Sequence, residues 1–388
     1  MKTSNSKTKA FAFWGATFVL LIALLFTGCP QSIENKPNIP SGPDPNLRIE
    51  GGVLKGYNEP PSGALVIPAG VTEIANSAFQ YCTSLTQVNF PASLTKIGSN
   101  AFYGCTGLTS LNLPASLETL NDFAFYGCTE ITGTVTLPAN LKTIGIYAFY
   151  GCKKVDAFDF TQCTQLTSIG SNAFGNCTKI TAVNLPASLE TIAGDAFSGC
   201  TALATLTVDA ASTHLSSEDN IVYDSGKTKL LCIAPKVASV TFPATLTEIA
   251  GGAFQYCTGL TQVHFPASLT KIDSFAFDAC VGISALDFSA CTQPLSIDIS
   301  AFCNCIGLSG TVFLPTNLKT IGNSAFYNCN KVDAFDFTHC TQLTYISGWA
   351  FRDCKADAVF TVKAGGGIKN LLLDSRSGIK ASQIQEVP

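Results

Sequence analysis

The sequence predicts an α/β repeat protein in which short parallel strands, corners and short helices stack into one curved solenoid. The pattern Ala-Phe-x-x-Cys recurs eleven times, at intervals of 23–25 residues apart from one interval of 57 residues. The composition is biased in the same direction, with 27 Phe, 17 Cys and 32 Gly against one Met. A short fixed period of this kind is typical of stacked repeat architectures. The repeat phenylalanines are Phe79, Phe102, Phe125, Phe149, Phe174, Phe197, Phe254, Phe277, Phe302, Phe326 and Phe351.

The first residues show the order of features found in export signals. Positive residues at Lys2, Lys7 and Lys9 precede an apolar stretch over residues 10–26 and a small residue before Cys29. Residues 25–29 resemble the lipobox of bacterial lipoproteins, in which the cysteine is lipidated and becomes the new N-terminus. We therefore expect residues 1–28 to be a signal peptide and Cys29 to be the lipidation site. The alternative is an uncleaved signal anchor, because the apolar stretch is about as long as the shortest membrane-spanning helix. Under either interpretation the body of the chain is exported and tethered to a membrane.

Residues 29–50 are predicted to be a proline-rich linker after the lipidated cysteine. This segment has few apolar residues, and its prolines favour an extended chain. We interpret it as a stalk between the bilayer and the folded part. The prolines are Pro30, Pro37, Pro40, Pro43 and Pro45.

One repeat unit has a physical interpretation. Leu111 and Leu113 point to the same side of a short strand because strand side chains alternate, and Pro114 ends that strand. Ala124 and Cys128 are four residues apart, which favours one inward-facing turn of helix around Phe125. A unit of this length cannot bury its own apolar face, but stacked units can. We therefore expect each repeat phenylalanine to lie over the preceding one in a buried column.

The L-x-x-L-x-L-P strand joined to I-G-x-x-A-F-x-x-C resembles the BspA-like leucine-rich repeats of bacterial surface proteins. The resemblance covers residues 51–362, nearly the whole exported chain. It implies a curved solenoid with a parallel sheet on its concave side, short helices or turns on its convex side, and β-hairpin units that interrupt the array.

The repeat region divides into five expected segments. Residues 51–75 form an N-terminal cap, residues 76–202 and 248–360 form two blocks of repeats, and residues 361–388 form a C-terminal cap or tail. The long interval, residues 203–247, contains a hairpin in which the strand before Lys227 returns as residues 230–233. Longer echoes such as Val155–Phe160 and Val332–Phe337 indicate that a block of several repeats was duplicated.

The cysteines are predicted to be buried thiols rather than a disulfide framework. Eleven of the 17 occupy the same repeat position, where a small apolar side chain completes the interior. Cys232 and Cys303 lie off this pattern and are the best candidates for a disulfide. A zinc site is disfavoured, because no second closely spaced pair accompanies Cys303 and Cys305.

Nothing in the sequence indicates catalysis or a cofactor. His214, His264 and His339 stand at variable repeat positions, and no nucleophile, zinc-protease or phosphate-loop motif is present. Asp287 and Asp336 lie two repeats apart, too far for one calcium ion to bridge. The formal charge of −4 and the absence of a basic run after the first residues argue against nucleic acid as a partner.

The outward positions of the strands form the predicted binding surface. They are small, polar and mostly uncharged, with one large aromatic residue at Phe313. A flat polar face lacks the apolar pocket that small-molecule sites prefer, so we expect a protein partner outside the cell or on a cell surface. The resemblance implies an adhesin-like surface lipoprotein; the alternative is an envelope scaffold without a host partner. The candidate contact residues are Asn89, Asn112, Asp159, Gln262, His264, Asp287, Phe313 and Asp336.

Overall fold

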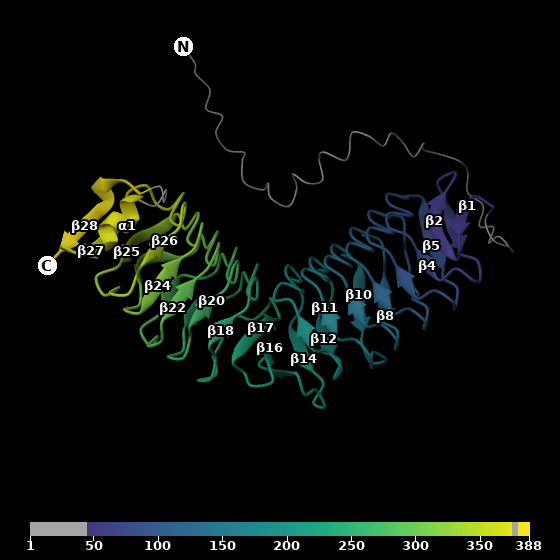
Figure 1. Cartoon of the computed structure of the whole chain (residues 1–388), viewed down its shortest axis with the longest axis horizontal. Helices are drawn as coiled ribbons and strands as arrows, with labels where there is room; N and C mark the ends of the chain where they lie inside the picture. Colours follow the sequence, from purple (N-terminus) through teal and green to yellow (C-terminus); the bar gives the residue numbers. More distant parts are fainter. Residues whose placement is uncertain (1–44, 375–378) are drawn as a thin grey trace, which may run out of the picture. The chain divides into compact units, whose positions relative to one another are not determined.

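The computed structural model describes residues 45–374 and 379–388. The described residues belong to one compact unit of the chain. All eleven repeats lie in it, where they stack side by side as a curved solenoid (Figure 1). The predicted signal peptide and Cys29 lie outside the described residues. The repeat solenoid with parallel strands that the sequence predicts is confirmed.

One side of the solenoid consists mainly of very short parallel strands, one from each repeat, and an antiparallel hairpin begins each of its two sheets. A β-branched or Leu residue at the second position of each two-residue strand points inward, for example Ile97 and Ile144. The first eight-stranded sheet contains β1 (Leu47–Glu50), β2 (Val53–Tyr57), β4 (Glu73–Ile74), β6 (Lys96–Ile97), β7 (Thr119–Leu120), β9 (Thr143–Ile144), β11 (Ser168–Ile169) and β13 (Thr191–Ile192). The second contains β15 (Leu215–Glu218), β16 (Ile221–Asp224), β17 (Lys229–Ile233), β18 (Glu248–Ile249), β20 (Lys271–Ile272), β22 (Leu295–Ile297), β24 (Leu318–Ile321) and β26 (Tyr345–Ile346).

The other side carries the L-x-L strands, which pair in parallel between neighbouring repeats. Their side chains alternate between buried and exposed, as in the pattern of β12, because one face of each strand packs on the core. We call their outward side the strand face. The paired strands are β3 (Gly63–Val66) with β5 (Leu85–Asn89), β8 (Gly133–Thr136) with β10 (Val155–Asp159), β12 (Ala182–Leu185) with β14 (Thr205–Val208), and β19 (Gln262–His264) with β21 (Ala285–Asp287). A last sheet joins β23 (Ser309–Phe313), β25 (Lys331–Asp336), β27 (Val359–Lys363) and β28 (Ile384–Val387).

The Ala-Phe segments are turns, whereas the sequence favoured one turn of helix there. In the third repeat the residues Phe123 and Gly127, on either side of Ala124–Tyr126, have φ of 58° and 69°. Left-handed residues cannot continue a right-handed helix. Hydrogen bonds to the next repeat hold this geometry, since the Phe123 N–H donates to the Ile146 carbonyl at 2.8 Å. Helix in the described residues is confined to α1 (Ile368–Asp374) and the 3-10 segment η1 (Ala381–Gln383).

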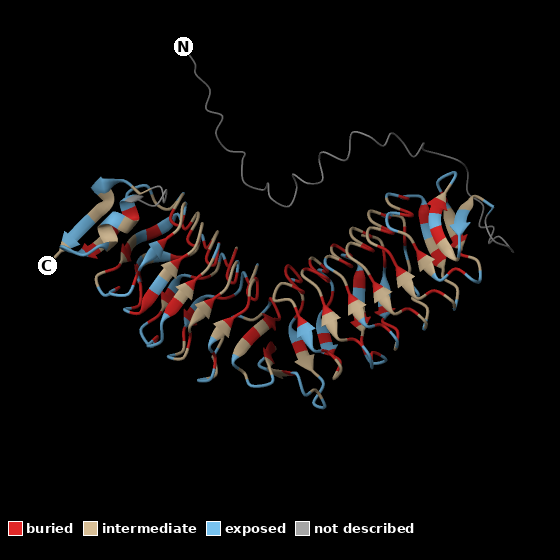
Figure 2. Cartoon of the chain, viewed as in Figure 1, coloured by how far each residue is buried: buried red, intermediate tan, exposed pale blue. Residues whose placement is uncertain are grey.

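The repeat phenylalanines form the predicted buried column. Within each block, successive rings stack with centroids 4.5–5.7 Å apart. Tyr57 extends the first column, because its ring stacks on Phe79 at 6.0 Å. Figure 2 shows the buried residues running along the whole stack between the two sides. The column therefore supplies most of the aromatic part of the core.

The repeat cysteines lie beside this column, and most of their sulfurs contact the backbone of the preceding repeat. The Cys128 sulfur lies 3.2 Å from the Phe102 carbonyl of the preceding repeat, and the Cys105 sulfur lies 3.0 Å from that of Phe79. Nine repeat cysteines donate this S–H hydrogen bond to a phenylalanine carbonyl, with sulfur–oxygen distances of 2.9–3.4 Å. All sixteen described cysteines are free thiols, including Cys232 and Cys303. The prediction of buried thiols at the repeat positions is confirmed, except that Cys354 is partly exposed.

The long interval forms an antiparallel hairpin that starts the second short-strand sheet. β15 and β16 are joined by Asp219 and Asn220, which have φ of 51° and 65°, as a two-residue type I′ turn requires. β17 then pairs in parallel with β18, just as β2, which forms an antiparallel hairpin with β1, pairs in parallel with β4. The hydrophobic core divides into two clusters at this point. The Ala-Phe turns nevertheless continue directly from one block to the next, because Ser198 Oγ donates to Gln255 Oε1 at 3.2 Å.

Candidate functional site

All eight predicted contact residues of the array lie on the strand face, at or near the strand ends. Asn112, Gln262, His264 and Phe313 are exposed, and the others are partly exposed. Phe313 has an exposed fraction of 62%, the highest of the large hydrophobic side chains in the described residues. Its register partner on the next strand is Asp336. The aromatic residue that the sequence singled out is therefore largely exposed to solvent.

The three aspartates of this set also have a local structural role. Asp159 Oδ1 accepts the backbone N–H of Thr161 at 2.9 Å, and Asp336 Oδ1 accepts that of Thr338 at 2.8 Å. Asp287 makes the same contact with Ser289 at 2.9 Å. Such Asx turns account for Asp at the end of each of these strands, whether or not a binding partner contacts it. Loss of the whole carboxylate would therefore disturb the chain as well as the surface.

His264 and Asp287 are brought together from neighbouring repeats. They are register partners on β19 and β21, and His264 Nδ1 lies 2.8 Å from Asp287 Oδ2. Hydrogen bonds from Ser289 and then from His264 lower the pKa of Asp287 to about 2. The carboxylate is thus ionised at all physiological pH values. The pair is a polar feature of the surface, and Ser289 adds side-chain and backbone hydrogen bonds to the Asp287 carboxylate.

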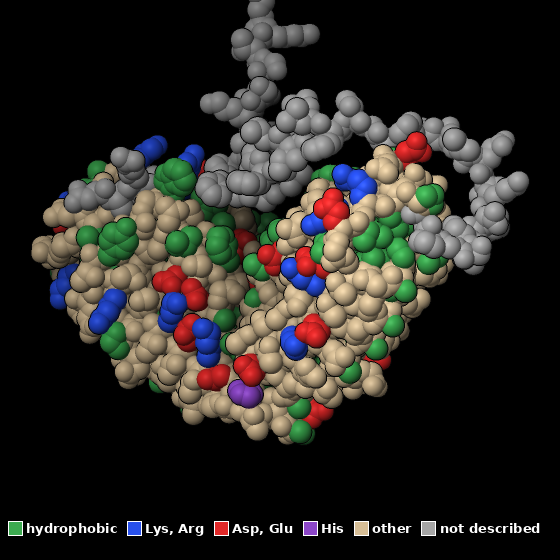
Figure 3. All heavy atoms as spheres, turned by 45° about the vertical axis from the view of Figure 1, so that its right-hand side comes forward, with side chains coloured by type: hydrophobic (Ala, Val, Ile, Leu, Met, Phe, Trp, Pro, Cys, Tyr) green, Lys and Arg blue, Asp and Glu red, His purple; other side chains and the backbone are tan. Residues whose placement is uncertain are grey.

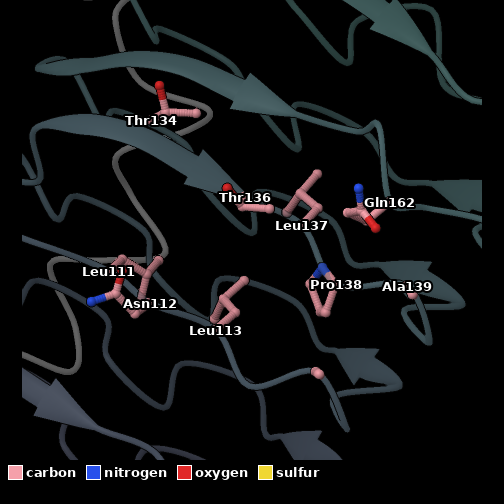
Figure 4. A pocket seen from close by; sticks show the side chains of 10 residues that line it. Leu111, Asn112, Leu113, Thr134, Thr136, Leu137, Pro138, Ala139 and Gln162 are labelled. Carbon is pink, nitrogen blue, oxygen red and sulfur yellow. The ribbon is translucent and has the colours of Figure 1, made fainter.

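Two shallow hollows lie at the ends of the L-x-L strands. The first has a volume of about 290 Å³ and lies between the strand ends of neighbouring repeats, with Asn112, Thr136 and Gln162 on its rim (Figure 4). The second has a volume of about 460 Å³ and is lined by Asp159 and Asn184 among others. These volumes are at the lower end of the range of small-molecule sites. The hollows are therefore shallow depressions of the strand face and do not form a deep pocket.

Many of the charged side chains are paired, mostly between neighbouring repeats. Lys142 Nζ lies 2.7 Å from Glu118, and Lys96 Nζ lies 3.1 Å from Glu73. Figure 3 shows basic and acidic side chains lying next to one another in small groups, with uncharged surface between them. Exposed pairs of this kind contribute little to stability, about 0–1 kcal/mol each. Their effect here is to leave the surface without a large field of either sign.

The described residues contain no group of three or more His, Cys, Asp or Glu that could hold a metal ion. The three histidines lie on different parts of the chain: His264 on β19, His214 just before β15, and His339 after β25. Burial raises the pKa of the thiols, to about 12 for Cys152 and Cys200. Such thiols remain protonated and are poor nucleophiles or ligands.

The sequence analysis missed a cluster of aromatic side chains on the edge formed by the Ala-Phe turns. Tyr103 stacks on Tyr126 at 4.6 Å, and Tyr126 stacks on Tyr150 at 5.0 Å. A second row begins with Phe123 stacked on Tyr147 at 5.1 Å. The recurrence of Ala-Phe-Tyr-Gly-Cys in three consecutive repeats was the available signal. We call the six rings the tyrosine cluster: Tyr81, Tyr103, Phe123, Tyr126, Tyr147 and Tyr150.

The same edge carries a polar chain in the second block. Gln255 Nε2 donates to Asp278 Oδ2 at 3.0 Å, and Asn304 Nδ2 donates to Asp278 Oδ1 at 3.2 Å. Asn328 then donates to Asn304 at 3.0 Å. Burial raises the pKa of Asp278, and these amide donors oppose that effect. This series of side-chain hydrogen bonds connects four consecutive repeats, so it stabilises the stack.

The fold of the chain is similar to that of bacterial proteins of known structure. No helix of the described residues is long and apolar enough to cross a membrane. No curated protein matches the sequence. A leucine-rich cell surface protein from Faecalibacterium prausnitzii shares 23% identity over 86% of this chain and 98% of its own, with a TM-score of 0.65. The pneumococcal vaccine antigen PcpA shares 20% identity over 89% of this chain and 96% of its own, also with a TM-score of 0.65.

The family model gives the assignment. The model of the BspA type leucine-rich repeat region, with six copies, matches residues 57–162, 132–223 and 231–357. These ranges cover well over half of the sequence and coincide with the stacked repeats described above. The chain therefore belongs to the BspA-type leucine-rich repeat family.

Proposed function

We propose that this protein is a non-enzymatic, adhesin-like surface lipoprotein that binds a protein partner through the strand face. The exposed Phe313 is the observation that carries this proposal. It is a large aromatic side chain held outward by a paired strand, with Asp336 as its register partner. Aromatic residues set among polar neighbours are typical of the few residues that dominate protein interfaces.

The surroundings of Phe313 support a macromolecular partner. The parallel strands from β19 to β27 present His264, Asp287 and Phe313 on successive strands of one side of the array. The hollows are small, and the formal charge of the chain is only −4, so neither a deep ligand site nor a strong electrostatic field competes with this interpretation. The similar protein from Faecalibacterium prausnitzii is described as a cell surface protein.

Membrane anchoring is the second part of the proposal. The lipobox-like residues 25–29 support cleavage before Cys29 and lipid attachment to its sulfur. Cells expressing the full chain are grown with a labelled fatty acid, and label on the wild-type protein but not on Cys29→Ala is the expected result. Equal label on both proteins would rule out Cys29 as the lipidation site, and no label on either would leave the signal anchor as the tether.

Exposure on intact cells tests the location that an adhesin needs. An added protease should cleave the repeat array on whole cells, and deletion of the gene should reduce adherence to other cells or to matrix. An array that resists protease until the envelope is broken, with adherence intact after deletion, would favour the envelope scaffold instead.

A further inference from the structure

We propose that residues 38–45 of this chain dock in extended form across the tyrosine cluster. The cluster is a continuous neutral surface of six rings from four consecutive repeats, bridged across its two rows by Tyr147 and Tyr150 at 5.1 Å. Tyr81 at its first end is about half exposed. Surfaces lined with aromatic rings recognise proline-containing segments in the polyproline II conformation.

The place where the chain joins the fold favours this occupant. The Asn46 carbonyl accepts the N–H of Asn58 at 2.9 Å, and the neighbouring Tyr57 stacks on Phe79 of the first repeat. Gly56 lies against the Ala78 carbonyl of the same turn: a Cβ atom placed on Gly56 would be 3.4 Å from the Ala78 oxygen. Residue 45 is thus beside the first Ala-Phe turn, at the Tyr81 end of the tyrosine cluster.

The length and spacing of the segment match the cluster. A polyproline II chain rises about 3.1 Å per residue, so eight residues reach about 25 Å. The fourth turn lies three stacking steps of 5.1–5.6 Å beyond the first. Pro40 and Pro43 are three residues apart, so they fall on one edge about 9 Å apart. Two ring steps, 4.6 and 5.0 Å, cover nearly the same distance.

The chemistry of the two surfaces also agrees. Residues 38–45 contain one charged side chain, Asp44, together with Ile39 and three prolines. Burial of the ring raises the pKa of Tyr126, so its phenol stays neutral and can donate a hydrogen bond. Proline-rich backbone has free carbonyl acceptors, because the conformation has no internal hydrogen bonds. Docking would leave the strand face free, so it is compatible with the proposed function but does not depend on it.

Photo-crosslinking in the full chain tests the contact. The crosslinker p-benzoylphenylalanine replaces Ile39, and the crosslinked peptides are mapped by mass spectrometry. We expect crosslinks within one molecule to the turns containing Tyr103, Tyr126 and Tyr150. The same crosslinker at Asn35, outside the segment, should give at least fivefold fewer crosslinks to these turns.

Variants separate the contact from general proximity. Tyr103→Ala with Tyr126→Ala should lower the yield from position 39 at least fivefold, whereas Tyr327→Ala, in the corresponding position of the second block, should not. Pro40→Gly with Pro43→Gly leaves the repeats untouched and should lower the yield to a similar extent. Crosslinks spread evenly over the array, found only between two copies, or insensitive to all of these changes would overturn the proposal.

Discussion

The repeat cysteines illustrate how a single residue works in this fold. Each sulfur fills a small space in the core and points at a phenylalanine carbonyl of the preceding repeat, as Cys280 does with Phe254 at 2.9 Å. Periodicity predicts the burial of these residues, because a position that recurs with every turn of the stack faces the same interior. It cannot predict the acceptor, which belongs to another repeat and is set by the turn geometry. The bond explains why a thiol, a weak donor, serves better than a methyl group.

Thiol reactivity tests the state of these residues. Burial raises the pKa of Cys303, one of two partly exposed thiols among the described cysteines, to about 12. A raised pKa means that the reactive thiolate is absent at neutral pH and appears only as the pH approaches 12. At pH 8 a thiol reagent should therefore modify few of the sixteen described cysteines in the native protein and nearly all of them in urea without reductant. Few reactive thiols after unfolding would mean that disulfides are present.

A matched pair of phenylalanines tests the core column. Phe174 is fully buried and stacks on Phe149 at 5.6 Å and on Phe197 at 5.3 Å. Phe174→Ala should lower the free energy of unfolding by about 3–5 kcal/mol. Phe313→Ala, at an exposed position, should change it by less than about 0.5 kcal/mol. Urea unfolding followed by circular dichroism measures both, and similar losses for the two variants would contradict the column.

At the scale of elements, the prediction of one turn of helix at the Ala-Phe segment was wrong. A four-residue spacing of inward residues suits a helix, and nothing local forbids one. The turn forms because hydrogen bonds to the next repeat hold bulky residues such as Tyr147, with φ of 55°, in the left-handed region. These bonds come from stacking, so a single repeat does not reveal them. The hairpin was easier to predict, because an apolar strand, a turn and a return strand follow one another in the sequence.

The turn of that hairpin gives a test at the same scale. Asn220 has φ of 65°, and its Oδ1 accepts the Leu206 N–H at 3.3 Å. Asn220→Val should destabilise the protein by about 1–2 kcal/mol, because a β-branched residue is disfavoured in the left-handed region. Asn220→Gly keeps the turn and loses only the side-chain bond, so it should be the milder of the two. Hydrogen exchange of residues 215–233 reports the change, and equal protection in both variants would argue against the type I′ turn.

At the scale of the whole molecule, the stacking of repeats brings side chains from separate repeats together into continuous surfaces. The outward strand positions were predictable one by one, because alternation along a strand determines which side chains point away from the core. Their partnerships were not: the contact of His264 with Asp287 depends on the register between repeats. The tyrosine cluster was missed for the same reason, since its members come from four separate turns. Single-repeat reasoning therefore predicts burial well and lateral contacts poorly.

Binding by the purified protein tests the central claim most directly. The full chain, with Phe313→Ala and Tyr345→Ala as variants, is measured against immobilised extracellular-matrix proteins. Tyr345 is the matched control, because it is 56% exposed but lies on β26, in the short-strand sheet. We expect saturable binding that varies little with salt, a loss of at least tenfold for Phe313→Ala, and no loss for Tyr345→Ala. An absence of binding by the folded wild-type protein, or equal affinity for wild type and Phe313→Ala, would contradict the account.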